Sequence, residues 1–113
     1  MANIYKNQGF DLTTTSKTTV YTCPASKTVL VKAIQATNIN SSNHELEAFF
    51  TDASNASTEY EIAHITLTAK TVDNLIKGTM VLEAGDELKL KAASANVIAG
   101  IISYLEIFDE KSA

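Results

Sequence analysis

Apolar and polar residues alternate along several segments of this chain, and short polar turns separate the segments. The clearest case is residues 44–51, where Leu46, Ala48 and Phe50 fall on one side of an extended chain. Successive side chains of a β-strand point to opposite faces, so a period of two predicts a half-buried strand. The pattern as a whole predicts seven or eight strands and no long helix. The segments are residues 18–23, 28–39, 44–51, 58–69, 79–83, 87–91 and 97–108.

Two of these strands depart from simple alternation. Residues 29–31 (Val-Leu-Val) are apolar without interruption, which is typical of a strand that is covered on both faces. In residues 58–69 the apolar positions change faces near Ala63, which predicts a β-bulge or a bend between two sheets. Residues 70–77 fit neither a strand nor a helix period, and we predict irregular structure there.

The connections between the strands carry residues that favour turns. Pro24 ends the first strand because its ring fixes φ and removes a backbone donor. Residues 40–43 (Asn-Ser-Ser-Asn) and 52–57 are polar turns. In the last third of the chain, Gly85 can adopt a positive φ at a tight corner. There the Asp86 carboxylate can accept hydrogen bonds from nearby backbone N–H groups.

Regularly spaced strands with short turns predict an antiparallel sandwich or a small barrel. Among the sandwiches we favour a jelly roll. An immunoglobulin-like topology is the alternative, although the chain lacks the Cys–Trp–Cys pattern of antibody domains. We therefore predict an all-β fold, a single antiparallel, jelly-roll-like β-sandwich over residues 18–108. Residues 1–17 are predicted to be an extended N-terminal arm, and residues 109–113 a charged C-terminal tail.

Composition and charge argue against several classes of function. The chain has 113 residues, enough for one domain, and its formal net charge is −4. An acidic chain without arginine is unsuited to general nucleic-acid binding. No apolar run approaches the roughly 20 residues that span a bilayer, so no membrane role is expected. The N-terminus shows no signal-peptide pattern, and Cys23 has no second cysteine for a disulfide, which fits assembly in a reducing cytoplasm.

Residues with catalytic or metal-binding chemistry are few and isolated in the sequence. His44 and His64 lack a metal-ligand spacing, and Cys23 has no neighbouring base that would generate a thiolate. Three carboxylate pairs are better interpreted as parts of a solvated sheet face. They are Glu45 with Glu47, Glu59 with Glu61, and Asp86 with Glu87. We therefore expect no enzymatic activity, no cofactor and no metal site.

Three segments together resemble the small virion proteins of tailed bacteriophages. Residues 18–34 contain a Val-Tyr-Thr-x-Pro strand that leads into a hydrophobic-Val-Lys-x-Ile strand, and residues 38–43 form the Asn-containing turn. Residues 82–88 are similar to the Leu-x-x-Gly-Asp-x-Leu corner of these proteins. Residues 103–107 are similar to their closing Ser-x-x-Glu-Ile strand. The motifs occur in the same order and span residues 18–108.

This resemblance implies a structural role in the virion. Such proteins are capsid decoration (cement) proteins or small tail, neck and fibre-base β-domains, and many form symmetric oligomers, often trimers. The resemblance thus implies a decoration protein on the outer head surface, bound to the major capsid protein or to other virion proteins. It implies assembly in the host cytoplasm, location in the virion and a homotrimer. A tail, neck or fibre-base protein is the alternative.

Exposed apolar and aromatic residues are the candidates for contact with these partners, because aromatic residues often carry much of the binding energy of an interface. The candidates are Ile4, Tyr5 and Phe10 in the predicted arm and Phe49 on the outward side of its strand. Ordinary core filling is the alternative interpretation of each of them.

A carbohydrate-binding β-sandwich is a third hypothesis, from a different class of function. Its sugar site would combine the ring of Tyr60 or Phe49 with the nearby polar side chains of Asp52 and Asn55. The absence of tryptophan argues against it.

Overall fold

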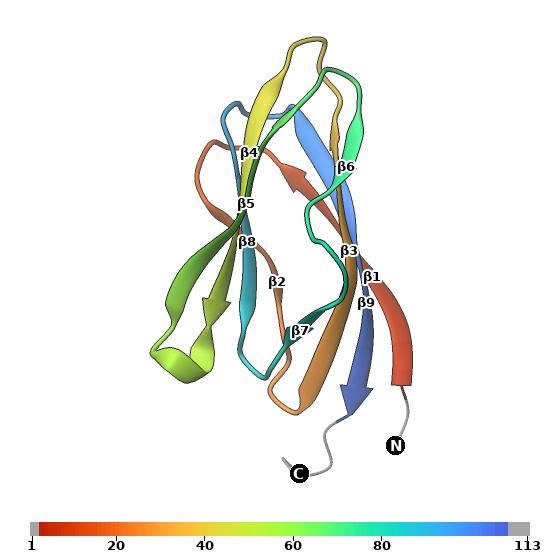
Figure 1. The fold of residues 1–113 in the computed structure, drawn as a ribbon, viewed down its shortest axis with the longest axis vertical. Helices are drawn as coiled ribbons and strands as arrows, with labels where there is room; N and C mark the ends of the chain where they lie inside the picture. Colours follow the sequence, from red (N-terminus) through yellow and green to blue (C-terminus); the bar gives the residue numbers. More distant parts are fainter. Residues whose placement is uncertain (1–2, 109–113) are drawn as a thin grey trace.

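Two antiparallel sheets face each other across an apolar core (Figure 1). A computed structural model describes residues 3–108 of the chain. Sheet A contains, in spatial order, β1 (Asn3–Leu12), β9 (Ile98–Phe108), β3 (Lys27–Asn38) and the short strands β6 (Val72–Asn74) and β7 (Met80–Leu82), which both pair with β3. Sheet B contains β2 (Thr18–Thr22), β8 (Glu87–Ala92), β4 (His44–Asp52) and β5 (Thr58–Leu67). One turn of 3-10 helix, η1 (Ala53–Asn55), follows β4.

The strands pair as one long antiparallel ribbon folded over into two sheets. β1 pairs with β9, β2 with β8, β3 with β6 and β7, and β4 with β5, so the first half of the chain meets the second half in reverse order. Because β6 and β7 occupy one place beside β3, the sandwich has the eight strand places of a jelly roll. The predicted all-β, jelly-roll-like sandwich is confirmed, and this strand order differs from the immunoglobulin alternative.

The first strand differs from the predicted arm. β1 pairs with β9 along its whole length, from Asn3 opposite Ile107 to Leu12 opposite Ile98, and forms the edge of sheet A. Most residues of β1 are exposed on both sides of the strand. Its sequence therefore lacks the alternating apolar pattern from which a strand would be predicted. Backbone hydrogen bonds to β9 hold it in the sheet. The predicted charged tail, residues 109–113, lies outside the described residues.

The pairing of β4 with β5 contains the irregularity that the sequence predicts near Ala63. Ala48 lies opposite Ala63, but the next residue, Phe49, lies opposite Glu61, so Ile62 has no partner. A bulge of this kind inserts one residue and changes the face to which the following side chains point. The predicted change of faces is therefore confirmed as a β-bulge.

The segment predicted to be irregular, residues 70–77, contains β6 and then leaves the sheet. The Asn74 side-chain oxygen accepts a hydrogen bond from the backbone N–H of Ile34 (3.0 Å), where a strand residue would use its own backbone. Leu75 and Ile76 then turn into the core. The strand beside β3 is thus interrupted because a side chain replaces part of the ladder.

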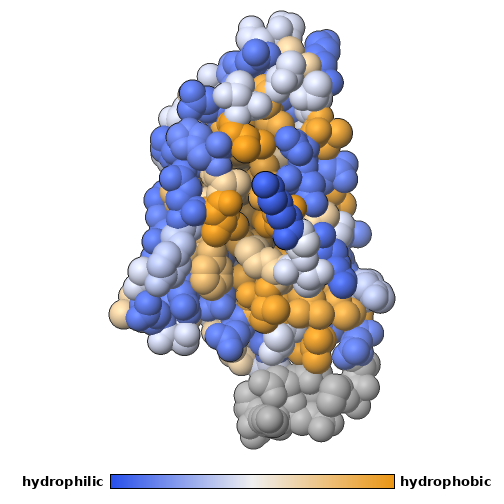
Figure 2. All heavy atoms as spheres, in the orientation of Figure 1, coloured by the Kyte–Doolittle hydropathy of each residue, from blue (hydrophilic) through white to orange (hydrophobic). Residues whose placement is uncertain are grey.

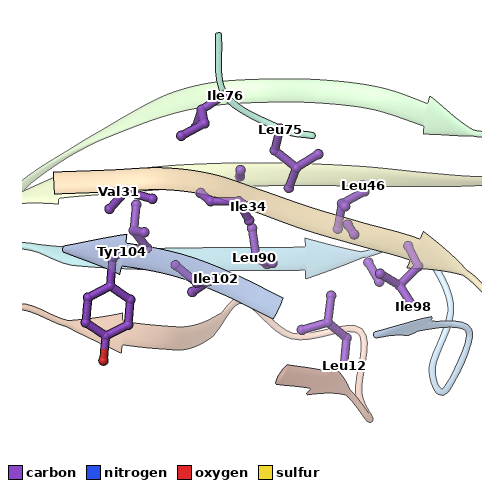
Figure 3. Close-up of a cluster of buried hydrophobic side chains, with 14 of the residues drawn as sticks. Leu12, Val31, Ile34, Leu46, Leu75, Ile76, Leu90, Ile98, Ile102 and Tyr104 are labelled. Atoms are coloured by element: carbon purple, nitrogen blue, oxygen red, sulfur yellow. The ribbon is translucent and has the colours of Figure 1, made fainter. Parts of the chain in front are cut away.

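Large aliphatic side chains from both sheets fill the core (Figure 3). Those that are buried almost completely include Leu12, Val29, Val31, Ile34, Leu46, Leu82, Leu88, Leu90, Ile98 and Ile102. They come from β1, β3, β4, β7, β8 and β9, so strands far apart in the sequence depend on one another for burial. Burying each such side chain stabilises a fold by about 1.5–3 kcal/mol before entropy is counted.

The corner between β7 and β8 ties three parts of the chain together. The Asp86 side chain is buried, and its two oxygens accept hydrogen bonds from the backbone N–H groups of Ala53 (2.9 Å) and Glu83 (2.8 Å). The backbone around Asp86 also bonds to Cys23 in both directions (2.8 and 3.0 Å). Gly85 has a φ of +86°, which glycine adopts at little cost. The corner predicted from the sequence is therefore a structural junction.

Candidate interaction surface

The two outer faces of the sandwich differ in charge. On sheet B, Leu88 and Leu90 point into the core, so the residues between and beside them point outward. The charged side chains on or over this face are Glu45, Glu47, Glu59, Glu61, Glu87, His64, Lys17, Lys89 and Lys91. Many pair with one another, as Lys89 does with Glu59 (3.5 Å) and with Glu87 (3.6 Å). This is the solvated face that Glu45 with Glu47 and Glu59 with Glu61 predict. The prediction is wrong for Asp86, which is buried because its carboxylate accepts backbone hydrogen bonds at the corner.

Phe49 lies in the middle of this charged face. It is opposite Lys89 in the ladder, and the Lys17 ammonium lies 4.0 Å from the centre of its ring. A cation over an aromatic face is a favourable contact, and here it covers the ring with a side chain of the same chain. Phe49 is therefore half-buried under Lys17, and it does not form an open apolar contact surface.

The outer face of sheet A carries a row of four apolar side chains, one from each of four neighbouring strands. Tyr5 of β1 lies opposite Leu105 of β9, Leu105 lies opposite Leu30 of β3, and Leu30 lies opposite Val81 of β7. The exposed fractions are 76% for Tyr5 and 54% for Val81, and both leucines are half-buried. We call these four residues the apolar row.

Uncharged residues surround the apolar row. The outward residues of β9 from Ala99 to Ile107 carry no charge, and those of β3 carry none apart from Lys32, which lies at the bulge opposite Ser103. Among the outward residues of β1, Asp11 near one end of the strand carries a charge. β9 is thus largely apolar on both faces, whereas the outer face of β3 carries Leu30 and Ala33 among polar residues. Among residues 3–108 only the inner faces of the two strands are covered.

An apolar groove opens along one edge of the sandwich. It has a volume of about 580 Å³ and lies between β5 and the segment that leads from β6 to β7. Its apolar lining consists of Ile62, Ala63, Ile65, Leu75, Ile76 and Met80. In Figure 2 apolar surface extends down the middle of this view, between the two sheets.

His64 is held by three carboxylates on the outer face of sheet B. Its Nε2 lies 3.0 Å from Glu45 Oε1, and its Nδ1 lies 3.4 Å from one oxygen each of Glu47 and Glu61. The bulge at Ile62 is what places Glu61 and His64 on one face. The hydrogen bond with Glu45 and the charges of the other two carboxylates raise the pKa of His64.

The same group is where a metal ion would fit best in the described part of the chain. One ligand atom each from Glu47, Glu61 and His64 lies within 4.8 Å of the others. The imidazole and the carboxylates already contact one another on an open surface. Their mutual attraction accounts for the arrangement, and we assign no ligand to it.

Cys23 and His44 occupy structural positions. Cys23 is buried, and burial together with the nearby Asp86 raises the pKa of its thiol to about 11. It is therefore a neutral thiol near pH 7, whereas a nucleophile needs the thiolate. His44 Nε2 lies 3.1 Å from Asn40 Oδ1, within the loop that the sequence predicts. These surroundings support the structural interpretation of both residues.

Tyr60 and its polar neighbours mostly contact one another. The Tyr60 ring stacks on Phe50 with 6.3 Å between centres, and its hydroxyl accepts a hydrogen bond from Asn55 (3.1 Å). Asp52 caps the first turn of η1 by accepting from the Ser54 N–H. The groups suggested for a sugar site thus have partners within the chain.

The residues predicted to form an interface do not gather in one place. Ile4 and Tyr5 are 47% and 76% exposed but project from opposite sides of β1. Phe10 is half-buried against the core and the backbone of Gly100, and Phe49 lies under Lys17. Of the four, only Tyr5 belongs to the apolar row.

The sequence signal for the rest of the apolar row is the run of apolar residues in two strands. Residues 29–31 are apolar without interruption, and residues 97–108 are apolar at most positions. Such runs are typical of strands that are covered on both faces. Leu30 and Leu105 lie on the side without cover. Their alignment with Tyr5 and Val81 depends on the register of the strand pairs, which cannot be read from the sequence.

Glu106 forms the most buried ion pairs of the described residues. It is 5% exposed and accepts from Lys27 Nζ (3.0 Å) and Lys6 Nζ (3.1 Å), which links the edge strand β1 to the inner face of β9. The hydrogen bond from Lys27, with the smaller effect of Lys6, lowers the pKa of Glu106 below its usual value of 4.5.

Stability should therefore fall in acid partly through Glu106. A lowered carboxyl pKa contributes stability that is complete above the unfolded pKa, about 4.3, and is lost as the pH falls through the folded pKa. We expect the free energy of unfolding, measured with urea from about pH 6 to about pH 3, to vary less in Glu106→Gln than in the native chain. The exposed Glu83→Gln is the control; if both variants behave as the native chain does, Glu106 has no such role.

No protein-family model matches the chain, and no curated protein matches its sequence. Solved structures share its fold. A protein of the Bacillus endospore appendages, which form disulfide-linked pili, superposes with a TM-score of 0.60 and 6% identity over 96% of this chain and 89% of that one. Two structures of infectious bursal disease virus, the viral particle and the Gx strain, give TM-scores of 0.57 and 0.55 at 8% and 10% identity.

These similarities show the fold alone, since the identities are low. The chain aligns over 94% and 96% of its own length with the two virus structures but spans only 31% and 32% of theirs. It corresponds to one β-sandwich within those proteins and to nearly the whole of the pilus protein. Among the described residues, no helix is long and apolar enough to cross a membrane.

Proposed function

We propose that the chain is a structural subunit of a tailed-bacteriophage particle, and specifically a capsid decoration protein on the outer surface of the head. One observation carries the proposal: β9 is largely apolar on both faces, and residues 3–108 cover only its inner face. Strands of this composition are normally buried on both sides. The uncovered face then serves as contact surface for a neighbouring subunit.

The fold and the chemistry of the chain support a structural role over a catalytic one. Jelly rolls recur in viral capsid proteins, and this chain superposes on structures of a virus particle and of a pilus protein, both repeating assemblies. The thiol of Cys23 is buried and neutral, and His64 is paired with carboxylates. The sequence motifs of residues 18–108 favour the phage virion among these assemblies.

The position of Cys23 argues against a disulfide linkage between copies of this chain like that of the pilus. Cys23 is the single cysteine of the chain, and it is buried against the backbone of β7 and the start of β3. A disulfide between copies would require this junction to open. Non-covalent contacts repeated over a symmetric shell are the alternative, and each can be weak because the shell multiplies them.

Decoration and tail locations differ in copy number. We expect electron microscopy of particles carrying an affinity-labelled form of this chain to place on the order of hundreds of copies over the head, as icosahedral symmetry requires. About six or twelve copies at one vertex or along the tail would support the tail, neck or fibre-base alternative. A particle that lacks the chain altogether would overturn the proposal.

A further inference from the structure

We propose that the apolar row is the contact between two copies of this chain, which pack the outer faces of their A sheets against each other. The inference deepens the proposed function by naming the neighbour that covers this face. It takes from that function only the premise that the face is an interface.

Charge favours a second copy on this face and disfavours one elsewhere. The chain has a formal net charge of −4, so two copies repel each other over most approaches. Sheet B presents five glutamates against three lysines, so it carries an excess of negative charge, and two such faces would repel each other. The surface around the apolar row is nearly uncharged, so a face-to-face contact keeps both acidic faces in water.

The row also has the symmetry that a pair of identical chains needs. A two-fold contact places the same patch of each copy against itself. The row crosses four strands with Leu30 and Leu105 at its centre and Tyr5 and Val81 at its ends. A two-fold axis near the centre would set leucines on leucines and leave Tyr5 facing the Val81 end of the other copy.

The area available suits a reversible dimer. Sheet A has three long strands, β1, β3 and β9, of 10, 12 and 11 residues, and the short strands β6 and β7 share the fourth place. At about 4.8 Å between strands and about 3.3 Å per residue, this face presents about 600 Å² per copy. Two copies would bury about 1,200 Å², the lower end of the range for specific interfaces. Lys32 lies two residues beyond Leu30 in the interior strand β3, and its long side chain lets the ammonium extend sideways to water.

Sedimentation equilibrium of the isolated full chain tests the inference, because it needs no particle. The monomer mass is 12.2 kDa, and we expect twice that mass to accumulate between about 1 μM and about 1 mM. Val81→Lys places a charge at an exposed end of the row and should weaken association by about tenfold or more. Thr66→Lys, exposed on sheet B, is the matched control and should associate as the native chain does.

Three outcomes would overturn this inference. They are a monomer over the whole range, a trimer in place of the dimer, or equal association of the Val81→Lys and Thr66→Lys variants. Circular dichroism of both variants establishes that they fold, since both changed positions are exposed. A monomeric native chain that still decorates heads would refute the dimer while leaving the proposed function intact.

Discussion

Replacing Gly100 with alanine should lower the free energy of unfolding by about 3 kcal/mol. Gly100 lies in β9 between Phe10 of β1 and Ala36 of β3. A Cβ at this position would fall far inside the contact distance of the Gln35 carbonyl oxygen and 2.7 Å from Phe10 Cζ. The carbonyl belongs to the backbone of the central strand, so it can move only if the ladder between β3 and β9 shifts.

The control for Gly100→Ala is Gly9→Ala, one strand away on the edge of the same sheet. A Cβ at Gly9 would meet its nearest atom, the Gly100 carbonyl oxygen, at 3.8 Å, which is ordinary contact. The free energy of unfolding of Gly9→Ala should be unchanged or rise by up to about 1 kcal/mol, because alanine reduces the conformational freedom of the unfolded chain. Urea denaturation of both variants gives the comparison; similar losses in the two would refute the close approach of β3.

The second large effect is expected at Asp86. Asp86→Ala leaves the backbone N–H groups of Ala53 and Glu83 without their buried acceptor, and hydrogen bonds to a charged group contribute about 1.5–3 kcal/mol each. We expect the free energy of unfolding to fall by about 3 kcal/mol in all. The junction with Cys23 should loosen as well, and the reactivity of the thiol towards a maleimide should rise.

Asp52→Ala is the matched control for Asp86→Ala. Asp52 also accepts a backbone hydrogen bond, from Ser54, but it does so as the cap of the short helix η1 at the surface. Loss of a cap costs about 1 kcal/mol, and Cys23 should stay protected. If thermal or urea denaturation shows Asp86→Ala to be as mild as Asp52→Ala, the corner is not a junction.

The features of the fold that could be predicted from sequence are local ones. Alternation of apolar and polar residues predicts β4, and the change of apolar faces near Ala63 predicts the bulge. The Gly85–Asp86 pair predicts the corner. Each of these features depends on residues that are neighbours in the sequence. β1 could not be predicted, since its exposed edge position removes the apolar pattern that marks the other strands. The nested pairing follows from contacts between distant segments. The spacing of the strands favours a jelly roll but cannot give the partner of each strand.

The candidate site was predicted only in part for the same reason. The apolar run at residues 29–31 predicts cover on both faces, but which side lacks a partner depends on where sheet B lies. The apolar row joins residues separated by as many as 100 positions, through three strand registers. Phe49 suggested an interface because its covering residue, Lys17, is far away in the sequence.

The central claim is that the outer face of sheet A is covered when the chain is in its particle. The most direct test is a cryo-electron microscopy map of the decorated heads, at a resolution that separates the strands. We expect density of another subunit against Tyr5, Leu30, Leu105 and Val81, while the charged face of sheet B borders solvent along most of its length. A map in which the apolar row faces open solvent would contradict it.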